Sequence, residues 1–69
     1  MNTLPIWLRD DGSVVSCVEK IKVMQENFEE IHQMMQDAFE DGLLLEVSEA
    51  QMRYILHKTV DELINSYLK

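Results

Sequence analysis

Residues 16–41, SCVEKIKVMQENFEEIHQMMQDAFED, contain neither proline nor glycine, and their apolar residues recur at steps of three and four. This spacing places the apolar side chains on one face of an α-helix. Ser16, followed three residues later by Glu19, matches a capping box at the start, and Ser13 is an alternative cap. Gly42 is typical of the position that follows a helix. The sequence therefore predicts a first helix over residues 16–41.

The last part of the chain predicts a second helix over residues 49–68. Ser48 and Gln51 match a second capping box, while Val47 and Met52 match the hydrophobic staple that often accompanies one. Two independent signals therefore agree on where this helix begins. An apolar stripe at helical spacing continues from there to the penultimate residue of the chain.

The loop between the two helices, residues 42–48, is short enough to require an antiparallel helical hairpin. A chain of 69 residues forms at most one domain, residues 1–69, and such a small domain needs burial beyond its own core. Val18, Met34 and Phe39 flank the apolar seam of the first helix, where one facing helix leaves them uncovered. We therefore expect two hairpins to form a homodimer, a four-helix bundle with twofold symmetry.

Residues 1–15 form an N-terminal arm before the first helix. Pro5 restricts its own backbone and favours an extended conformation in the residue before it. Asp11-Gly12 lies between short apolar runs and matches a tight hairpin, but a lone two-stranded hairpin is barely stable. We therefore expect an extended arm with a turn over residues 10–13.

The arm also offers a monomeric alternative to the dimer, in which Leu4, Ile6, Trp7 and Leu8 fold across the open face of the hairpin. If the arm does not close the hairpin, Trp7 is the expected anchor for a partner, because large aromatic residues dominate the energy of interfaces. The burial of Trp7 distinguishes the two arrangements. The residues expected to contact a partner are Trp7, Leu8, Val18, Met34 and Phe39.

The chain is acidic, with six Lys and Arg residues against thirteen Asp and Glu residues and a formal charge of −7. This charge repels nucleic-acid phosphates and anionic membrane surfaces, so we expect neither as a partner. No run of about eighteen apolar residues occurs, and the start lacks the basic and apolar regions of a signal peptide. The expected location is the cytoplasm, where the single cysteine, Cys17, stays reduced.

Two sequence patterns suggest a metal-binding site or a reactive thiol. Glu29 and His32 have the Glu-x-x-His spacing by which helices of di-iron bundles bind metal, but both fall on the flank of the first helix. A metal-binding helical bundle is therefore the alternative function, and we expect no cofactor. Cys17 is either a nucleophile activated by the helix dipole or, as we favour, a small apolar filler. The sequence contains no phosphate-binding glycine loop, nucleophile elbow or paired-cysteine motif, so we do not expect an enzyme.

Three segments, LPIWLRDDGS, SCVEKIKV and QDAFEDGLL, together with the spacing of the second helix, resemble small uncharacterised helical proteins of proteobacteria. The resemblance covers most of the chain. It implies a compact bacterial protein without a named activity, and it carries over no catalytic or binding residue. The sequence therefore predicts an all-α protein that acts as a protein–protein interaction or structural module.

Overall fold

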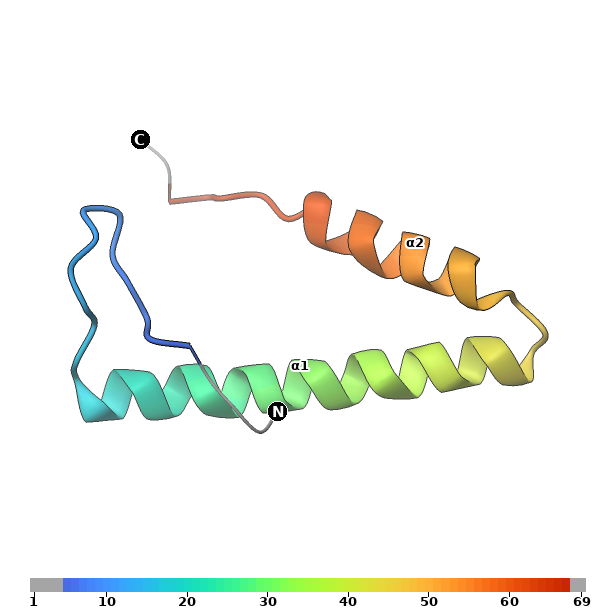
Figure 1. Cartoon of the computed structure of the whole chain (residues 1–69), viewed down its shortest axis with the longest axis horizontal. Coiled ribbons are helices and arrows are strands. Elements are labelled where there is room, and N and C mark those ends of the chain that lie inside the picture. Colours follow the sequence, from blue (N-terminus) through green and yellow to red (C-terminus); the bar gives the residue numbers. More distant parts are fainter. Residues whose placement is uncertain (1–4, 68–69) are drawn as a thin grey trace. The chain divides into compact units, whose positions relative to one another are not determined.

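The computed structural model describes residues 5–67, which form two α-helices and no β-strand (Figure 1). Helix α1 spans Val18–Leu44 and helix α2 spans Glu49–Asp61. The predicted all-α class and the order of two helices are confirmed. Contacts divide the chain into two compact units whose boundary lies inside α1, between Met34 and Met35. The first unit holds the arm and the start of α1, and the second holds the end of α1 and α2.

Helix α1 begins two residues later than predicted. The carbonyl of Cys17 accepts a helical hydrogen bond from Ile21 N at 3.0 Å, so Cys17 occupies the position before the first helical residue. The predicted start at Ser16 is therefore wrong, because Cys17, and not a residue before Ser16, directly precedes the first helical residue, Val18.

The end of α1 lies three residues beyond its predicted position. The helix closes with a Schellman motif, in which Glu46 N donates to Leu43 O at 3.1 Å and Val47 N donates to Gly42 O at 3.0 Å. Glu46 takes the left-handed conformation, with φ of 68°, that a glycine commonly supplies. The predicted position of Gly42 after the helix is therefore wrong, because this glycine lies inside α1.

Gly42 lies where the end of α1 packs against α2. The residue is buried, and the Met52 side chain occupies the space beside it, with Met52 Cγ 2.9 Å from where a Cβ of residue 42 would lie. One turn earlier in α1, the Phe39 ring lies under the Arg53 guanidinium, whose carbon is 5.0 Å from the ring centroid. These contacts form the predicted antiparallel hairpin within the second unit, with a loop over residues 45–48 instead of 42–48.

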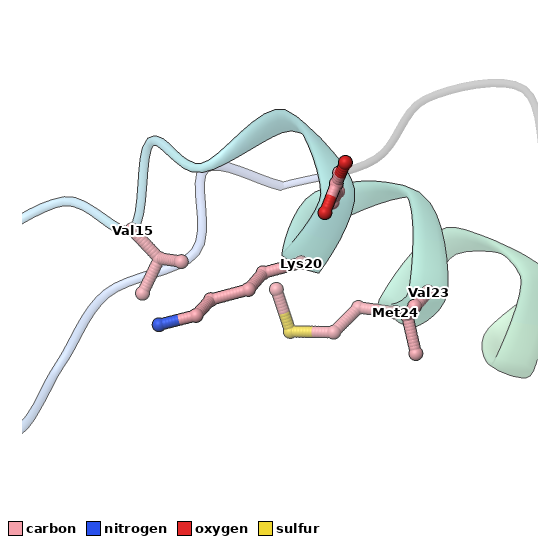
Figure 2. A pocket seen from close by; sticks show the side chains of 5 residues that line it. Val15, Lys20, Val23 and Met24 are labelled. Carbon is pink, nitrogen blue, oxygen red and sulfur yellow. The ribbon is translucent and has the colours of Figure 1, made fainter.

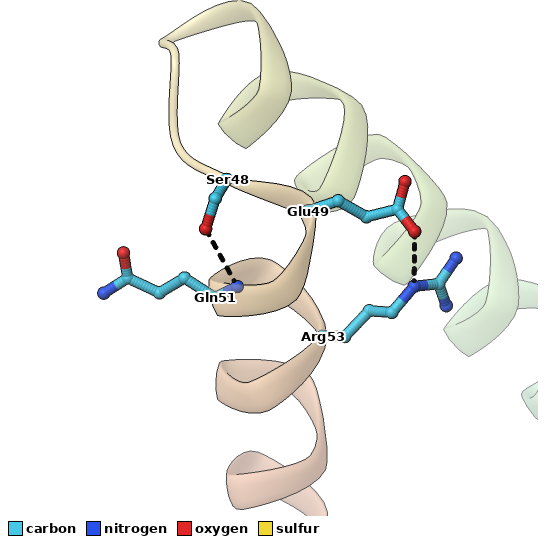
Figure 3. A network of polar contacts seen from close by, with 4 residues as sticks. All are labelled: Ser48, Glu49, Gln51 and Arg53. Carbon is cyan, nitrogen blue, oxygen red and sulfur yellow. Dashed lines mark hydrogen bonds and ion pairs between the residues drawn. The ribbon is translucent and has the colours of Figure 1, made fainter.

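Helix α2 begins where the sequence predicts. The Ser48 hydroxyl oxygen accepts a hydrogen bond from Gln51 N at 3.1 Å, and Glu49 pairs with Arg53 Nε at 3.0 Å (Figure 3). The helix ends at Asp61, however, so the predicted helix over residues 49–68 is too long. The side chains that follow are exposed, and no packing offsets the entropy cost of fixing their backbone in a helix.

The N-terminal arm doubles back on itself instead of running extended. Val15 N donates to Trp7 O at 2.8 Å, and Leu8 and Val14 form an antiparallel bridge. The expected extended arm is therefore wrong, although the turn lies at residues 10–13 as predicted. Because successive side chains of an extended strand point to opposite sides, Trp7 and Val15 lie half buried on one side, and Leu8 and Val14 are exposed on the other.

Gly12 and Asp11 stabilise the turn of the arm. Gly12 N donates to Arg9 O at 2.9 Å, and its φ of 85° is one that other residues rarely adopt. The Asp11 carboxylate accepts hydrogen bonds from Ser13 Oγ at 2.6 Å and from Ser13 N at 2.9 Å. These two bonds hold the pKa of Asp11 below its usual range. Local bonds of this kind explain why the short hairpin forms at Asp11-Gly12.

Candidate functional site

Trp7 connects the arm to α1 within the first unit. Its ring centroid lies 5.5 Å from that of Phe28, and the two ring planes are tilted by 31°. The indole Nε1 is buried and has no hydrogen-bond partner among the described residues. This ring contact shows that the arm packs on α1 within the first unit. The role of Trp7 as an anchor for a partner stays a prediction.

An apolar groove lies beside the end of the arm and the first turns of α1. Its lining residues are Val15, Glu19, Lys20, Val23 and Met24. Figure 2 shows the Lys20 and Met24 side chains leaving the helix on the side where Val15 lies. The groove therefore combines an apolar surface with one cationic and one anionic side chain, Lys20 and Glu19.

The other residues predicted to contact a partner are spread over both units. Leu8, Val18 and Met34 are exposed, with Val18 and Met34 showing 78% and 73% of their surface to solvent. Phe39 is only half buried, and the Arg53 guanidinium covers one face of its ring. The four residues do not form one cluster within either unit.

Three highly exposed apolar side chains follow α2, including the two most exposed of the described residues, and sequence reasoning did not place a binding surface there. Leu63, Ile64 and Tyr67 expose 77%, 87% and 91% of their surface. The sequence assigns them to the apolar stripe of the second helix and so treats them as packed. Their residue types continue that stripe, so no signal in the sequence marks them as exposed.

Glu29 and His32, the predicted metal-binding pair, have no third potential ligand beside them among residues 5–67. Glu29 and His32 are exposed on α1. Within residues 5–67, no three His, Cys, Asp or Glu side chains lie close enough together to hold a metal ion. The metal-binding alternative built on Glu29 and His32 therefore stays a prediction.

Cys17 is exposed at the start of α1, so the expectation of an apolar filler is wrong. Hydrogen bonds from the backbone N–H groups of Lys20 and Glu19, followed by the positive charge of Lys20, hold the pKa of its thiol below its usual range. These N–H groups are the free donors of the first helical turn, and they stabilise the thiolate more than the thiol.

We expect the Cys17 thiol to react with an aromatic disulfide reagent with a pH midpoint below about 8.5, the usual value for a free thiol. Stopped-flow absorbance between pH 5 and pH 10 measures this midpoint. The matched control is Cys17→Ser combined with Val18→Cys, which moves the thiol one residue into the helix and away from those N–H donors. Equal midpoints in the two proteins would show that the start of α1 does not activate Cys17.

No helix in the described part of the chain has both the length and the apolar character needed to cross a membrane. Comparison of the chain with protein-family models, with curated proteins and with solved structures gave no match. Functional inference therefore rests on the residues and surfaces of this chain.

Proposed function

We propose that this chain is a small cytoplasmic protein–protein interaction module that works as a homodimer, in which two helical hairpins form a four-helix bundle. The observation that carries the proposal is the absence of a buried apolar side chain among residues 5–67. Hydrophobic residues make up 46% of the sequence, so the chain has apolar surface to bury. Association with another protein surface is the means by which a chain of this size buries it.

The apolar residues of α1 support a partner that packs along the helix. Within the second unit, Phe39 and Gly42 face α2. Val18 and Met34 are not covered in this way and remain exposed. A two-helix hairpin covers each helix on one side only, whereas two hairpins related by a twofold axis cover both sides. In such a dimer the exposed surface of α1 that carries Val18 and Met34 packs against the same surface of α1 in the other copy. The proposed interface therefore does not require a second kind of protein.

Sedimentation equilibrium at micromolar concentration tests the proposal. We expect a mass of about 16 kDa, twice the chain mass of 8.1 kDa. Met34→Glu places a charge on the proposed interface and is expected to raise the dimer dissociation constant at least about tenfold. Gln36→Glu adds the same charge two residues away, on the opposite side of α1, and is expected to leave the constant within about twofold.

A monomer of 8.1 kDa that retains full helical circular dichroism would refute the dimer. It would favour the alternative in which the arm closes the hairpin. Equal weakening by Met34→Glu and Gln36→Glu would show that added charge, and not the Met34 surface, disturbs association.

A further inference from the structure

Helix α2 ends at Asp61 although the residues that follow contain no helix terminator. Glu62 keeps a right-handed helical backbone, and Leu63 N donates to Val60 O at 3.1 Å, which continues the chain as a 3₁₀ turn. The C-terminal segment, residues 62–67, contains neither glycine nor proline, the residues that commonly end a helix. The sequence of this segment therefore does not prevent α2 from continuing.

The apolar stripe of α2 continues into the C-terminal segment. Leu56 and Val60 line one cavity together with Met35 of α1, so this stripe is the side of α2 that faces α1 within the second unit. Leu63 and Tyr67 follow Val60 at steps of three and four, which would place them on the same stripe of a longer helix. Both side chains are exposed instead. The segment therefore has the residues of a longer α2 but not its packing.

The register of the hairpin determines where a longer α2 would lie. Val60 and Met35 share a cavity, and the two helices are antiparallel. Phe28 and Ile31 precede Met35 on the same stripe of α1, and α1 is one continuous helix. Phe28 lies two turns, about 10 Å, before Met35, and in a continued helix Tyr67 would lie the same distance beyond Val60. A longer α2 would therefore bring Tyr67 beside Phe28.

The N-terminal arm covers this stripe in the first unit. The Trp7 ring centroid lies 5.5 Å from that of Phe28, and the stripe residues Ile21 and Met24 are half buried. The Trp7 indole Nε1 is buried and has no partner among the described residues, which weakens the hold of the arm on α1. The arm therefore occupies the surface that a longer α2 needs, through a contact that leaves one polar group unsatisfied.

We infer that the N-terminal arm and the C-terminal segment are alternative covers for one surface of α1, the surface around Phe28. While Trp7 lies on Phe28, α2 ends at Asp61. When the arm is displaced, α2 extends through Tyr67 and covers Phe28 instead. The occupant is the segment of the same chain because it continues the α1–α2 interface, whose register leads to Phe28. The inference goes beyond the proposed dimer and does not depend on it.

Trp7→Ala in the full chain tests the coupling. Loss of the ring contact is expected to shift the equilibrium from the docked to the released arm at least about tenfold. The Cα chemical shifts of residues 62–67, measured by nuclear magnetic resonance, are then expected to move toward helical values. Leu8→Ala alters the exposed side of the arm and is expected to leave these shifts unchanged. Equal shifts in the two variants would overturn the inference.

A nuclear Overhauser effect between the Tyr67 and Phe28 rings identifies the new contact. We expect it in Trp7→Ala, and an isotope-filtered spectrum of mixed labelled and unlabelled protein is expected to place it within one chain. Phe28→Ala combined with Trp7→Ala removes the surface and is expected to leave residues 62–67 non-helical. A contact between two chains, or a helical segment in this double variant, would overturn the inference. A monomeric natural protein would refute the proposed dimer and leave this test intact.

Asn65→Ala tests the same coupling without touching the arm. It removes the side-chain oxygen that accepts a hydrogen bond from Tyr67 N at 2.8 Å, and alanine favours a helix. Residues 62–67 are expected to become more helical, and Trp7 fluorescence is expected to move to longer wavelength as the ring leaves Phe28. Asn65→Asp keeps the accepting oxygen and is expected to change neither signal. A longer helix with unchanged Trp7 fluorescence, or no helical gain in Asn65→Ala, would overturn the inference.

Discussion

Trp7→Ala is expected to lower the free energy of unfolding by about 2 kcal/mol. The substitution removes the ring contact with Phe28, which holds the arm on α1 in the first unit. The value is below that for a fully buried tryptophan because Trp7 is only half buried. Urea denaturation followed by far-ultraviolet circular dichroism, at one protein concentration because association shifts apparent stability, measures the loss.

Two further variants identify the cause of the loss. Leu8→Ala alters the neighbouring side chain, which is exposed on the other side of the arm, and is expected to cost less than about 0.5 kcal/mol. Trp7→Phe keeps an aromatic ring and removes the buried Nε1, which lacks a partner, so its cost is expected to be well below that of Trp7→Ala. Unchanged stability of Trp7→Ala would mean that the arm does not stabilise α1 and that Trp7 is free to anchor a partner.

Gly42→Val is expected to lower the free energy of unfolding by about 2 kcal/mol, although valine forms helices at least as readily as glycine. A Cβ at residue 42 would overlap Met52 Sδ and lie 2.6 Å from Met52 Cε and 2.9 Å from Met52 Cγ. The Met52 side chain must then leave this position and lose its packing against the end of α1. Denaturation in urea measures the effect, and Ala38→Val on the exposed side of α1 controls for the branched side chain.

Met52→Ala tests whether the overlap with Met52 causes the loss. In the natural protein this substitution removes packing and is expected to cost about 1 kcal/mol, because Met52 is half buried. In the Gly42→Val protein it removes the overlap and is expected to restore stability. The two substitutions are therefore strongly non-additive. Additive losses would indicate that Gly42 matters through its backbone and not through contact with Met52.

Local chemistry explains which parts of the fold the sequence predicts well. Ser48 and Gln51 lie three residues apart, so their hydrogen bond forms as soon as the backbone turns into a helix. The turn at Asp11-Gly12 depends in the same way on bonds to Ser13 and on the left-handed conformation of Gly12. The apolar periodicity of residues 16–41 likewise predicts a long first helix, which the structure has.

The predicted C-terminal ends of both helices are wrong, because tertiary packing, or the lack of it, determines where each helix ends. Gly42 is a common helix terminator, yet α1 continues through it to Leu44, and Met52 occupies the space that a Cβ of residue 42 would need. Glu46, which no sequence rule places in a left-handed conformation, ends the helix instead. After Asp61 the apolar pattern continues but the helix does not, since the side chains that follow have no surface to pack on.

The candidate site likewise combines features that local sequence predicts with features that only tertiary contacts determine. From its sequence alone, the chain is determined to be an acidic all-α protein with a capped second helix, a turn in its arm and more apolar surface than one hairpin covers. Only the tertiary structure decided that Trp7 packs on Phe28, that Cys17 is exposed, and that Lys20 lines an apolar groove. Periodicity and capping depend on residues a few positions apart, whereas a groove depends on which distant side chains meet and on which find no partner.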